Sequence, residues 1–413
     1  MYHSSADYKE LLNFYRNKRI LITGHTGFKG AWLTRILLNA GACVCGYASE
    51  PPTDPNLFTI TGLADIMAEN SVTGDIRDLY HLKSVFASFR PDIVFHLAAQ
   101  PIVRDSYRDP VGTYSTNVMG TVNILECIRL SEPGQELNDG TWKGVQSFLN
   151  VTTDKVYKNN EWEYGYREND PLDGFDPYSN SKSCSELVTH AYRSSFFEGN
   201  EHAVRISTAR AGNVIGGGDF AKDRIIPDCV RAVQHAFQNK ADTAEITVRN
   251  PYSIRPYQHV LEPLFAYLMI AKAQYEDRTF AGYYNVGPDD CDCITTGELV
   301  ELFCEKWNRL FSADCGTDTQ GDGTQIFPDG FPHAGWRSVA EPGAPHEADF
   351  LKLDTSRMKR TFHWKPHWHM DQAVEQTVRF SKVWLRCAEK NDYSETAKEM
   401  DREIAEYIGG IVK

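Results

Sequence analysis

The sequence predicts an α/β fold in which helices cover both faces of a doubly wound parallel sheet. Apolar runs typical of short strands alternate with helical patterns as far as about residue 209, as parallel strands joined by crossover helices require. The first run, residues 19–23, ends in a glycine-rich turn, and residues 31–38 then place apolar side chains at helical spacing. Strand, glycine turn and helix in this order indicate a Rossmann-type, dinucleotide-binding sheet.

The glycine-rich turn carries the first candidate binding residues. Gly24, Gly27 and Gly30 let the backbone turn tightly and approach a pyrophosphate, whose charge would lie on the amides of the helix N-terminus. Thr26 and Phe28 share this turn and are expected to contact the cofactor. A glycine triad alone also fits an ordinary turn before a helix, so the prediction depends on the strands that follow.

The second strand, near residues 43–47, bears on the choice of cofactor. An acidic residue at the end of this strand would bind the adenosine ribose of NAD, but Glu50 comes slightly late, so the ribose contact stays unassigned. No Lys or Arg lies between Cys43 and Asn70 to receive a 2'-phosphate. NAD is therefore favoured over NADP.

Two further strands complete the predicted cofactor site. A third strand precedes Asp75 and Ile76, which are expected to flank the adenine, and a fourth strand spans residues 92–99. Small or apolar residues end the fourth strand where the cofactor would pass, namely Leu97, Ala98 and Ala99.

The alternation of strand and helix breaks down in the second half of the chain. We expect residues 18–209 to form the NAD-binding domain, with segments around 246–290 contributing to it. Residues 210–413 should mainly form a smaller mixed α/β lobe that closes over the carboxyl edge of the sheet and binds the substrate. Within this lobe, residues 312–345 form an insert rich in Gly, Asp and Pro that is expected to be a lid, an interface arm or partly disordered.

Tyr178 and Lys182 are the candidate pair for hydride chemistry. Their four-residue spacing places both side chains on one face of a helix. A hydride leaves a carbinol carbon only if the hydroxyl proton is removed in step with it. Tyr178 is the candidate base, provided that Lys182 and a cationic nicotinamide lower its pKa. Lys182 would also hold the nicotinamide ribose.

Three motifs resemble the extended short-chain dehydrogenase/reductase family, and within it the nucleotide-sugar 4,6-dehydratases. They are the Thr-Gly-x-x-Gly-x-x-Gly turn from Thr23, Leu97–Ala99, and Tyr178-x-x-x-Lys182. Further segments between about Lys18 and about Trp384 are similar to the branch of that family that acts on CDP-glucose: residues 97–107, 164–168, 176–182, 210–219, 254–259 and 346–354.

The resemblance implies a lyase that dehydrates a nucleotide-activated hexose for deoxysugar biosynthesis, such as that of O-antigen. The expected reaction converts CDP-D-glucose to CDP-4-dehydro-6-deoxy-D-glucose by oxidation at C4, loss of water across C5 and C6, and hydride return to C6. The family implies that Asp154 is the acid at the C6 hydroxyl and Lys155 the base at C5, while Thr153 would bind the C4 oxygen. Many relatives have Asp-Glu here, and a lysine takes a carbon-bound proton only in its neutral form, so an electrostatic role for Lys155 stays open.

A sugar nucleotide also needs its diphosphate neutralised. Guanidinium groups suit phosphate oxygens, and three arginines with one asparagine resemble family positions that contact the nucleotide. Two residues after the fourth strand are further candidates for sugar or phosphate contacts. The six predicted substrate-binding residues are Gln100, Arg104, Asn213, Arg224, Arg249 and Arg255.

Composition excludes several other classes of protein. The 413 residues carry 43 basic and 56 acidic side chains, a net charge of -13, so nucleic acid and acidic membranes are not expected partners. No apolar run is long enough for a membrane span, and the first residues lack a secretion signal, so we expect a cytoplasmic protein. A homodimer or higher homo-oligomer is expected by analogy with the fold.

No metal is expected from the sequence. The ten cysteines are scattered and should be reduced thiols, and the pairs Cys43/Cys45 and Cys291/Cys293 make weak zinc motifs. The histidines of residues 363–369 should belong to a packed aromatic stretch containing Trp364 and Trp368.

Two alternatives to a dehydratase remain open from the sequence. A sugar-nucleotide 4-epimerase or dehydrogenase of the same fold would share Tyr178 and Lys182, but would have no use for an acid and base at Asp154 and Lys155. A catalytically silent NAD-binding scaffold is disfavoured by the complete set of catalytic residue types.

Overall fold

A computed structural model describes residues 4–131, 136–137, 140–198, 204–310, 330–339 and 351–409. The main sheet runs through the first part of this chain and takes one late strand. Its strands are β1 (Arg19–Thr23), β2 (Cys43–Ala48), β3 (Ser71–Thr73), β4 (Ile93–His96), β7 (Ser147–Thr153), β8 (Arg205–Ala211) and β13 (Tyr283–Val286).

The order of the strands is that of a doubly wound sheet. Within the described chain the seven strands lie in the order β13-β8-β7-β4-β1-β2-β3, and every neighbouring pair is parallel. The chain builds outward from β1 to β3 and then returns to the other side of β1 with β4. Ligands bind at such a reversal, outside the carboxyl ends of the strands. The predicted α/β fold class is confirmed.

Helices cover both faces of the sheet and bury its strands. One face carries α2 (Phe28–Asn39) and α11 (Leu261–Glu276), and the other carries α5 (Leu79–Phe89), α8 (Gly120–Arg129) and α9 (Pro177–Tyr192). Each face has its own apolar core, and every residue of β7 is buried, as expected for a parallel strand covered on both sides. α1 (Ser5–Tyr15) and α15 (Ser394–Gly409) contact each other beyond α11.

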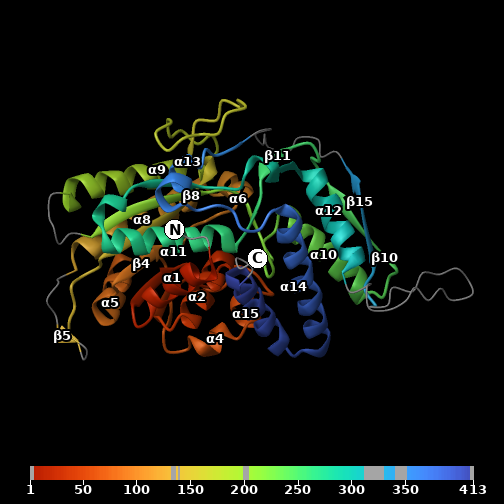
Figure 1. Cartoon of the computed structure of the whole chain (residues 1–413), viewed down its shortest axis with the longest axis horizontal. Helices are drawn as coiled ribbons and strands as arrows, with labels where there is room; N and C mark the ends of the chain where they lie inside the picture. The colour runs from red at the N-terminus through yellow and green to blue at the C-terminus, as the bar shows by residue number, and fades with distance from the viewer. Residues whose placement is uncertain are drawn as a thin grey trace, which may run out of the picture.

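The second lobe lies at one end of the sheet, at the right of Figure 1. It contains α10 (Ile225–Gln238), β10 (Thr243–Val248), α12 (Thr296–Arg309) and β15 (His333–Ser338), with β10 and β15 paired in parallel. α14 (Met370–Lys390) contacts both α12 and α15. Two small sheets join the lobes: β9 (Val214–Ile215) with β12 (Gln258–His259), and β11 (Ile254–Pro256) with β14 (Cys293–Thr295).

Short elements complete the described fold. α3 and α4 follow β2, α6 and α7 follow β4, a π-helical turn spans Ser115–Met119, and a 3-10 turn spans Asp154–Val156. Their bounds, with those of the remaining strands and helix, are α3 (Leu57–Ile60), α4 (Leu63–Ile66), β5 (Glu136–Leu137), β6 (Gly140–Thr141), α6 (Val103–Arg108), α7 (Pro110–Tyr114) and α13 (Ser356–Phe362).

Several expectations about the second half can be compared with the fold. The late strand β13 joins the main sheet, whereas β10 lies in the second lobe. Trp364 and Trp368 are buried, as expected for packing residues. Most of the insert at 312–345 lies outside the described residues, and its described part contains β15.

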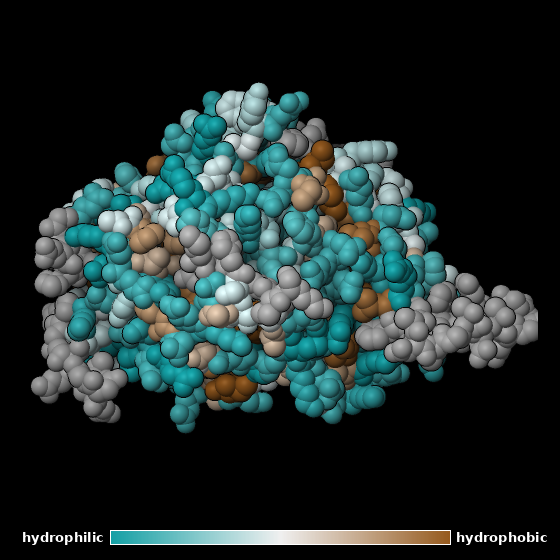
Figure 2. Space-filling model, viewed as in Figure 1, coloured by the Kyte–Doolittle hydropathy of each residue, from teal (hydrophilic) through white to brown (hydrophobic). Residues whose placement is uncertain are grey.

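Polar and apolar residues are mixed on the surface. Figure 2 shows hydrophilic residues over most of one face, with hydrophobic residues interspersed among them. Among the residues that the structure describes, no helix combines the length and the apolar character that a membrane span needs.

Candidate active site

The glycine-rich turn leaves no room for side chains where it meets β4 and α2. Gly24 has φ +77, and a Cβ there would lie 2.8 Å from the backbone nitrogen of Ala98. A Cβ on Gly30 would lie 2.1 Å from the carbonyl oxygen of Gly24. α2 begins at Phe28, and its N-cap Gly27 contributes no side-chain cap, so the first amides of the helix are available to an anion.

The end of β4 is held by a buried histidine. Burial lowers the pKa of His96 to about 3, so its imidazole is neutral. Its Nδ1 lies 2.7 Å from the Thr23 hydroxyl, which accepts a hydrogen bond from the backbone N–H of Ala98 at 3.2 Å. This network fixes Leu97–Ala99 beside the glycine turn, where the sequence predicts the cofactor to pass.

Asp75 and Ile76 follow β3 at the same edge of the sheet. The Arg77 guanidinium holds the pKa of Asp75 below its usual value, and their ion pair is 2.5 Å long. Ile76 is buried, and its side chain fills the space beside Gly120. The carboxylate of Asp75 is thus engaged by Arg77 and Ile76 packs beside Gly120, while their contact with the adenine stays a prediction.

α9 presents Tyr178 and Lys182 to the carboxyl end of β7. Asp176 caps this helix by accepting the Ser179 N–H at 3.0 Å. The Lys182 ammonium donates to the backbone oxygen of Val151 at 3.1 Å, and burial lowers its pKa to about 8. The structure thus brings this predicted pair to the end of β7.

The surroundings of Tyr178 differ from those expected. Burial raises the pKa of Tyr178 to about 12, and the groups that oppose this rise are Thr153, through a side-chain hydrogen bond, and the cation of Arg224. The Lys182 ammonium is directed to the β7 backbone, and its expected lowering of the Tyr178 pKa together with a cationic nicotinamide stays a prediction.

Asp154 is buried, and only one of its two carboxyl oxygens has a hydrogen-bond partner among the described residues. Thr153 donates its hydroxyl hydrogen bond to Asp154 Oδ1 at 2.9 Å, while Oδ2 is buried without a hydrogen-bond partner among the described residues. Burial raises the pKa of this carboxyl against the attraction of Lys155, which is half-buried on the same 3-10 turn. A buried carboxyl oxygen without a partner, on a group whose pKa is raised, is suited to exchange a proton with a bound substrate.

A second buried acid, Glu186, connects α9 to the strands that carry the site. Glu186, one turn beyond Lys182 on α9, accepts hydrogen bonds from Thr152 and from Thr208, the latter at 2.7 Å. Its Oε2 also lies 2.9 Å from Arg210 Nη2, and both side chains are almost fully buried. Arg210 extends the network to Tyr157 by donating to its hydroxyl oxygen at 2.8 Å. The network joins α9 to β7 and β8.

The predicted arginines fall into two groups. Arg224 forms an ion pair of 3.0 Å with Asp219 and acts on Tyr178. Burial raises the pKa of Asp154, and the charge of buried Arg255 partly opposes that rise. These two cations thus act on the predicted catalytic residues Tyr178 and Asp154, in addition to the phosphate contact predicted for them.

The other two arginines lie around Asp223. Arg104, from α6, is 3.8 Å from its carboxylate, and Arg249, which follows β10, is 3.4 Å from it. The structure therefore brings together two cations that are far apart in the sequence, and an incoming diphosphate could replace Asp223 as their partner.

Gln100 and Asn213 are placed less favourably for direct contact. The Gln100 amide donates to Ile102 and Thr113 and accepts from the N–H of Ile102, so its polar atoms are engaged in the loop after β4. Asn213 is half-buried, and its backbone oxygen accepts the N–H of Gln258.

Sequence reasoning missed two charged residues of the site. Lys29, in the first turn of α2, has its pKa lowered to about 8 by burial and by Arg224, and the charges of Asp154, Lys182 and Asp219 also act on it. Asp219 holds Arg224. Lys29 occupies an unspecified position of the Thr-Gly-x-x-Gly-x-x-Gly motif, so the motif did not mark it as a site residue. Only the fold places it near residue 154.

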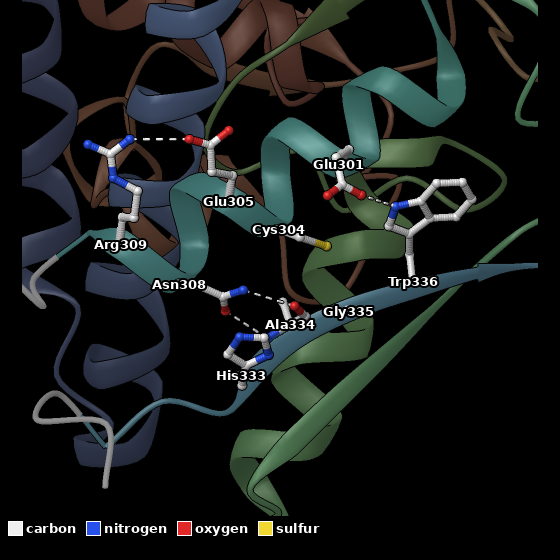
Figure 3. A pocket seen from close by; sticks show the side chains of 9 residues that line it. All are labelled: Glu301, Cys304, Glu305, Asn308, Arg309, His333, Ala334, Gly335 and Trp336. Atoms are coloured by element: carbon white, nitrogen blue, oxygen red, sulfur yellow. Dashed lines mark hydrogen bonds and ion pairs between the residues drawn. The ribbon is translucent and has the colours of Figure 1, made fainter. Parts of the chain in front are cut away.

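A groove between α12 and β15 lies apart from these residues. Figure 3 shows its polar side chains paired with one another: Glu301 with Trp336, Glu305 with Arg309, and Asn308 with the backbone of Ala334. Cys304, His333 and Gly335 complete its lining. None of these residues belongs to the predicted catalytic set.

The sequence is similar to known nucleotide-sugar dehydratases. The model of the family "GDP-mannose 4,6 dehydratase" matches residues 21–377. The CDP-glucose 4,6-dehydratase of Salmonella typhimurium is 43% identical over 405 residues, which cover 97% of this chain and 99% of that protein. The dTDP-glucose 4,6-dehydratase of Haemophilus influenzae is 24% identical over 372 residues, 87% of this chain and 97% of that protein.

Solved structures share the fold at low sequence identity. The dTDP-glucose 4,6-dehydratase from Bacillus anthracis, in complex with NAD, has a TM-score of 0.62 and 19% identity, covering 92% of this chain and 99% of that one. The UDP-glucose 4-epimerase from Stenotrophomonas maltophila, with bound NAD, has a TM-score of 0.66 and 18% identity, covering 91% and 100%.

Fold and site together define an enzyme of the extended short-chain dehydrogenase/reductase type. The chain belongs to the GDP-mannose 4,6 dehydratase family. The predicted assignment to the nucleotide-sugar 4,6-dehydratases, which are lyases, is confirmed.

Proposed function

We propose that this protein converts CDP-D-glucose to CDP-4-dehydro-6-deoxy-D-glucose with a retained NAD. The CDP-glucose relative that matches 97% of the chain supports the choice of substrate. The buried, half-satisfied Asp154 carries the choice of reaction, because a dehydratase needs a proton donor beside the oxidation site.

NAD would lie between the glycine-rich turn and α9. The available amides at the start of α2 would bind its pyrophosphate, Asp75 and Ile76 would flank its adenine, and Lys182 would hold the nicotinamide ribose. When bound, NAD supplies the acceptor for the C4 hydride and returns that hydride to C6. Structural neighbours of the family hold NAD, which supports this cofactor here.

The residues of this chain then divide the proton transfers. Tyr178 takes the C4 hydroxyl proton, and its burial means that added positive charge must lower its pKa from about 12 when the ligands bind. Arg224 already acts in that direction. Thr153, which contacts both Tyr178 and Asp154, is placed to hydrogen-bond the C4 oxygen.

Elimination uses the neighbouring residues. Once C4 is a ketone, the C5 proton is acidic, and Lys155 would remove it in its neutral form while Asp154 protonates the departing C6 hydroxyl. The raised pKa of Asp154 favours the protonated form that this step requires. Arg255 beside Asp154, and Arg104 with Arg249 around Asp223, would neutralise the diphosphate.

A homodimer fits the surface near α9. Val111, Met119 and Leu187 are 79%, 50% and 54% exposed, and they lie on α7, the π-helical turn and α9, which contact one another. A second copy would bury these apolar side chains. Light scattering after size exclusion should give a dimer that Leu187→Glu weakens, and a monomer in the unchanged protein would contradict the dimer.

The reaction is tested with purified protein and a panel of nucleotide-activated glucoses without added reductant. CDP-glucose should give the ultraviolet signature of a 4-keto sugar in alkali, with no net NADH. Stoichiometric NADH would favour a dehydrogenase, recovery of the C4 epimer would favour an epimerase, and no reaction with any sugar would favour a silent scaffold.

A further inference from the structure

Cys291, Asp292 and His369 lie together on the surface, far from Tyr178 in the sequence and on elements that the proposed reaction does not use. The Cys291 Sγ is 3.8 Å from Asp292 Oδ2 and 3.9 Å from His369 Nδ1, and the two latter atoms are 2.8 Å apart. Neither segment alone predicts a metal site, and only the fold brings the cysteine and the histidine together.

The separations of these three atoms are close to those of a tetrahedral cation site. Bonds of about 2.3 Å to sulfur and about 2.0 Å to nitrogen and oxygen imply ligand separations of roughly 3.3–3.6 Å at a tetrahedral angle. The observed separations bracket that range, so movements of a few tenths of an ångström would close the site. Cys291 and the 57% exposed side chain of His369 give a cation access from solvent.

The carboxylate is already oriented for coordination. The side chain of Asp292 is only 5% exposed, and its Oδ1 accepts the N–H of Met370 at 2.8 Å. This hydrogen bond fixes the carboxylate and leaves Oδ2 directed at the cysteine and the histidine, as an outer-shell partner does for a ligand.

The position at the start of α14 opposes a cation, since the helix N-terminus is positive. A thiolate and a carboxylate together carry two negative charges, which offset both the helix terminus and a divalent ion. Soft sulfur with imidazole nitrogen selects ions of the zinc class over magnesium or calcium.

We propose that Cys291, Asp292 and His369 bind a divalent cation of the zinc class, with water as the fourth ligand. Binding forms the bonds to Sγ, Oδ2 and Nδ1 and releases the thiol proton to solvent. The Nδ1 hydrogen shared with Asp292 is also given up, which leaves the imidazole in its neutral Nε2–H form and replaces the direct contact between Asp292 and His369. The cation would then join the 3-10 turn Asp290–Asp292, which directly precedes β14, to the N-cap of α14.

The proposed cation site is linked to the proposed substrate site by the pairing of two strands. β14 pairs antiparallel with β11, and within that pairing Ile294 lies opposite Arg255. Arg255 is the buried arginine that acts on Asp154. A bound cation would therefore restrain the strand that supports Arg255, without touching the reacting groups.

The test uses the full chain, freed of metal by a chelator and titrated with Co²⁺ as a spectroscopic probe. One equivalent should produce the near-ultraviolet thiolate-to-cobalt charge-transfer band, and Zn²⁺ should displace it. Cys291→Ser should abolish the band, and His369→Ala should weaken Co²⁺ binding at least tenfold, since even the loss of a group that only orients a ligand costs about 10- to 100-fold in affinity. Circular dichroism of each variant checks that it is folded.

Matched controls separate this site from other thiols and histidines. Cys293→Ser and His363→Ala remove neighbouring residues outside the cluster and should leave the band and the affinity unchanged. The proposal is overturned if no band forms, if the band survives Cys291→Ser in a folded protein, or if Cys293→Ser removes it.

Discussion

Two pairs, each of a threonine and a buried acid, lie at the carboxyl end of β7. They differ in how many of the acid's oxygens have hydrogen-bond partners. Thr152 donates to Glu186, and its neighbour Thr153 donates to Asp154. Glu186 has an arginine and two threonines as partners, whereas Asp154 Oδ2 has no hydrogen-bond partner in the described chain.

Alternation along the strand produces this division. Consecutive residues of a strand point to opposite faces, so adjacent threonines serve different acids. The fully paired acid, Glu186, stabilises the junction of α9 with β7 and β8. The half-paired acid, Asp154, keeps an oxygen for the substrate. The comparison predicts that changes to the first pair reduce stability and that changes to the second reduce activity.

The largest effect on stability should come from Arg210→Met. It leaves Glu186 buried without its cation, and removing one partner of a buried ion pair costs about 3–5 kcal/mol. Chemical denaturation should show this loss. The control Arg309→Met breaks an exposed pair and should cost far less, and equal losses in the two variants would remove the distinction between the pairs.

The largest effect on activity should come from Tyr178→Phe. Loss of the base for the C4 hydroxyl should lower turnover by on the order of a hundredfold or more, with NAD binding retained. Calorimetric titration with NAD and a 4-keto sugar assay measure the two properties. Turnover near that of the unchanged protein would exclude Tyr178 as the base.

Asp154→Asn should slow only the loss of water, by on the order of a hundredfold. Bound NADH and 4-ketoglucose should still form, because the acid at C6 has no part in oxidation at C4. Rapid quenching and absorbance at the NADH band separate the steps. Equal slowing of both would place Asp154 in the oxidation itself.

The same variant tests the sign of the stability effect of Asp154. The pKa of Asp154 is raised in the folded state by burial. The protonated carboxyl therefore contributes its full stability at pH values below the ordinary pKa of 3.8, and this contribution is lost as pH rises through the raised pKa. Asp154→Asn should therefore be at least as stable as the unchanged protein at pH 7, with the difference shrinking on acidification. A variant that is less stable at pH 7 would show that the carboxylate is paired.

Lys155→Met should give the smallest and most specific change. If Lys155 is the C5 base, the variant still oxidises C4 but exchanges the C5 proton with deuterated solvent more slowly, by on the order of tenfold or more. Mass spectrometry of recovered sugar measures the exchange. Exchange at the original rate would assign Lys155 an electrostatic role and leave the base elsewhere.

Local patterns made part of this site predictable. The glycine spacing, the four-residue step from Tyr178 to Lys182 and the end of β7 are short-range features, and they indicated both the fold and the reaction type. Arg210 lay inside a recognised segment, but its partner could not be read from spacing because the ion pair crosses between a helix and a strand.

Long-range contacts account for what the sequence did not reveal. Lys29 and Asp154 act on each other only after the sheet forms, and 78 residues separate Cys291 from His369. Spacing likewise did not reveal that a backbone oxygen of β7 accepts a hydrogen bond from the Lys182 ammonium. Rotamer direction and burial decide such contacts, and neither is encoded in residue spacing.

The C-terminal helix α15 constrains when this protein can finish folding during its synthesis. Buried Glu262 accepts a hydrogen bond from Tyr407 across 145 residues, and buried His259 lies 2.7 Å from Glu403. Ribosomes add about 5–20 residues per second, so these partners on α15 emerge roughly 7–30 s after α11. For that interval Phe265 of α11 lacks the ring of Tyr407 on which it stacks in the finished fold, so this part of the core cannot close before α15 is made.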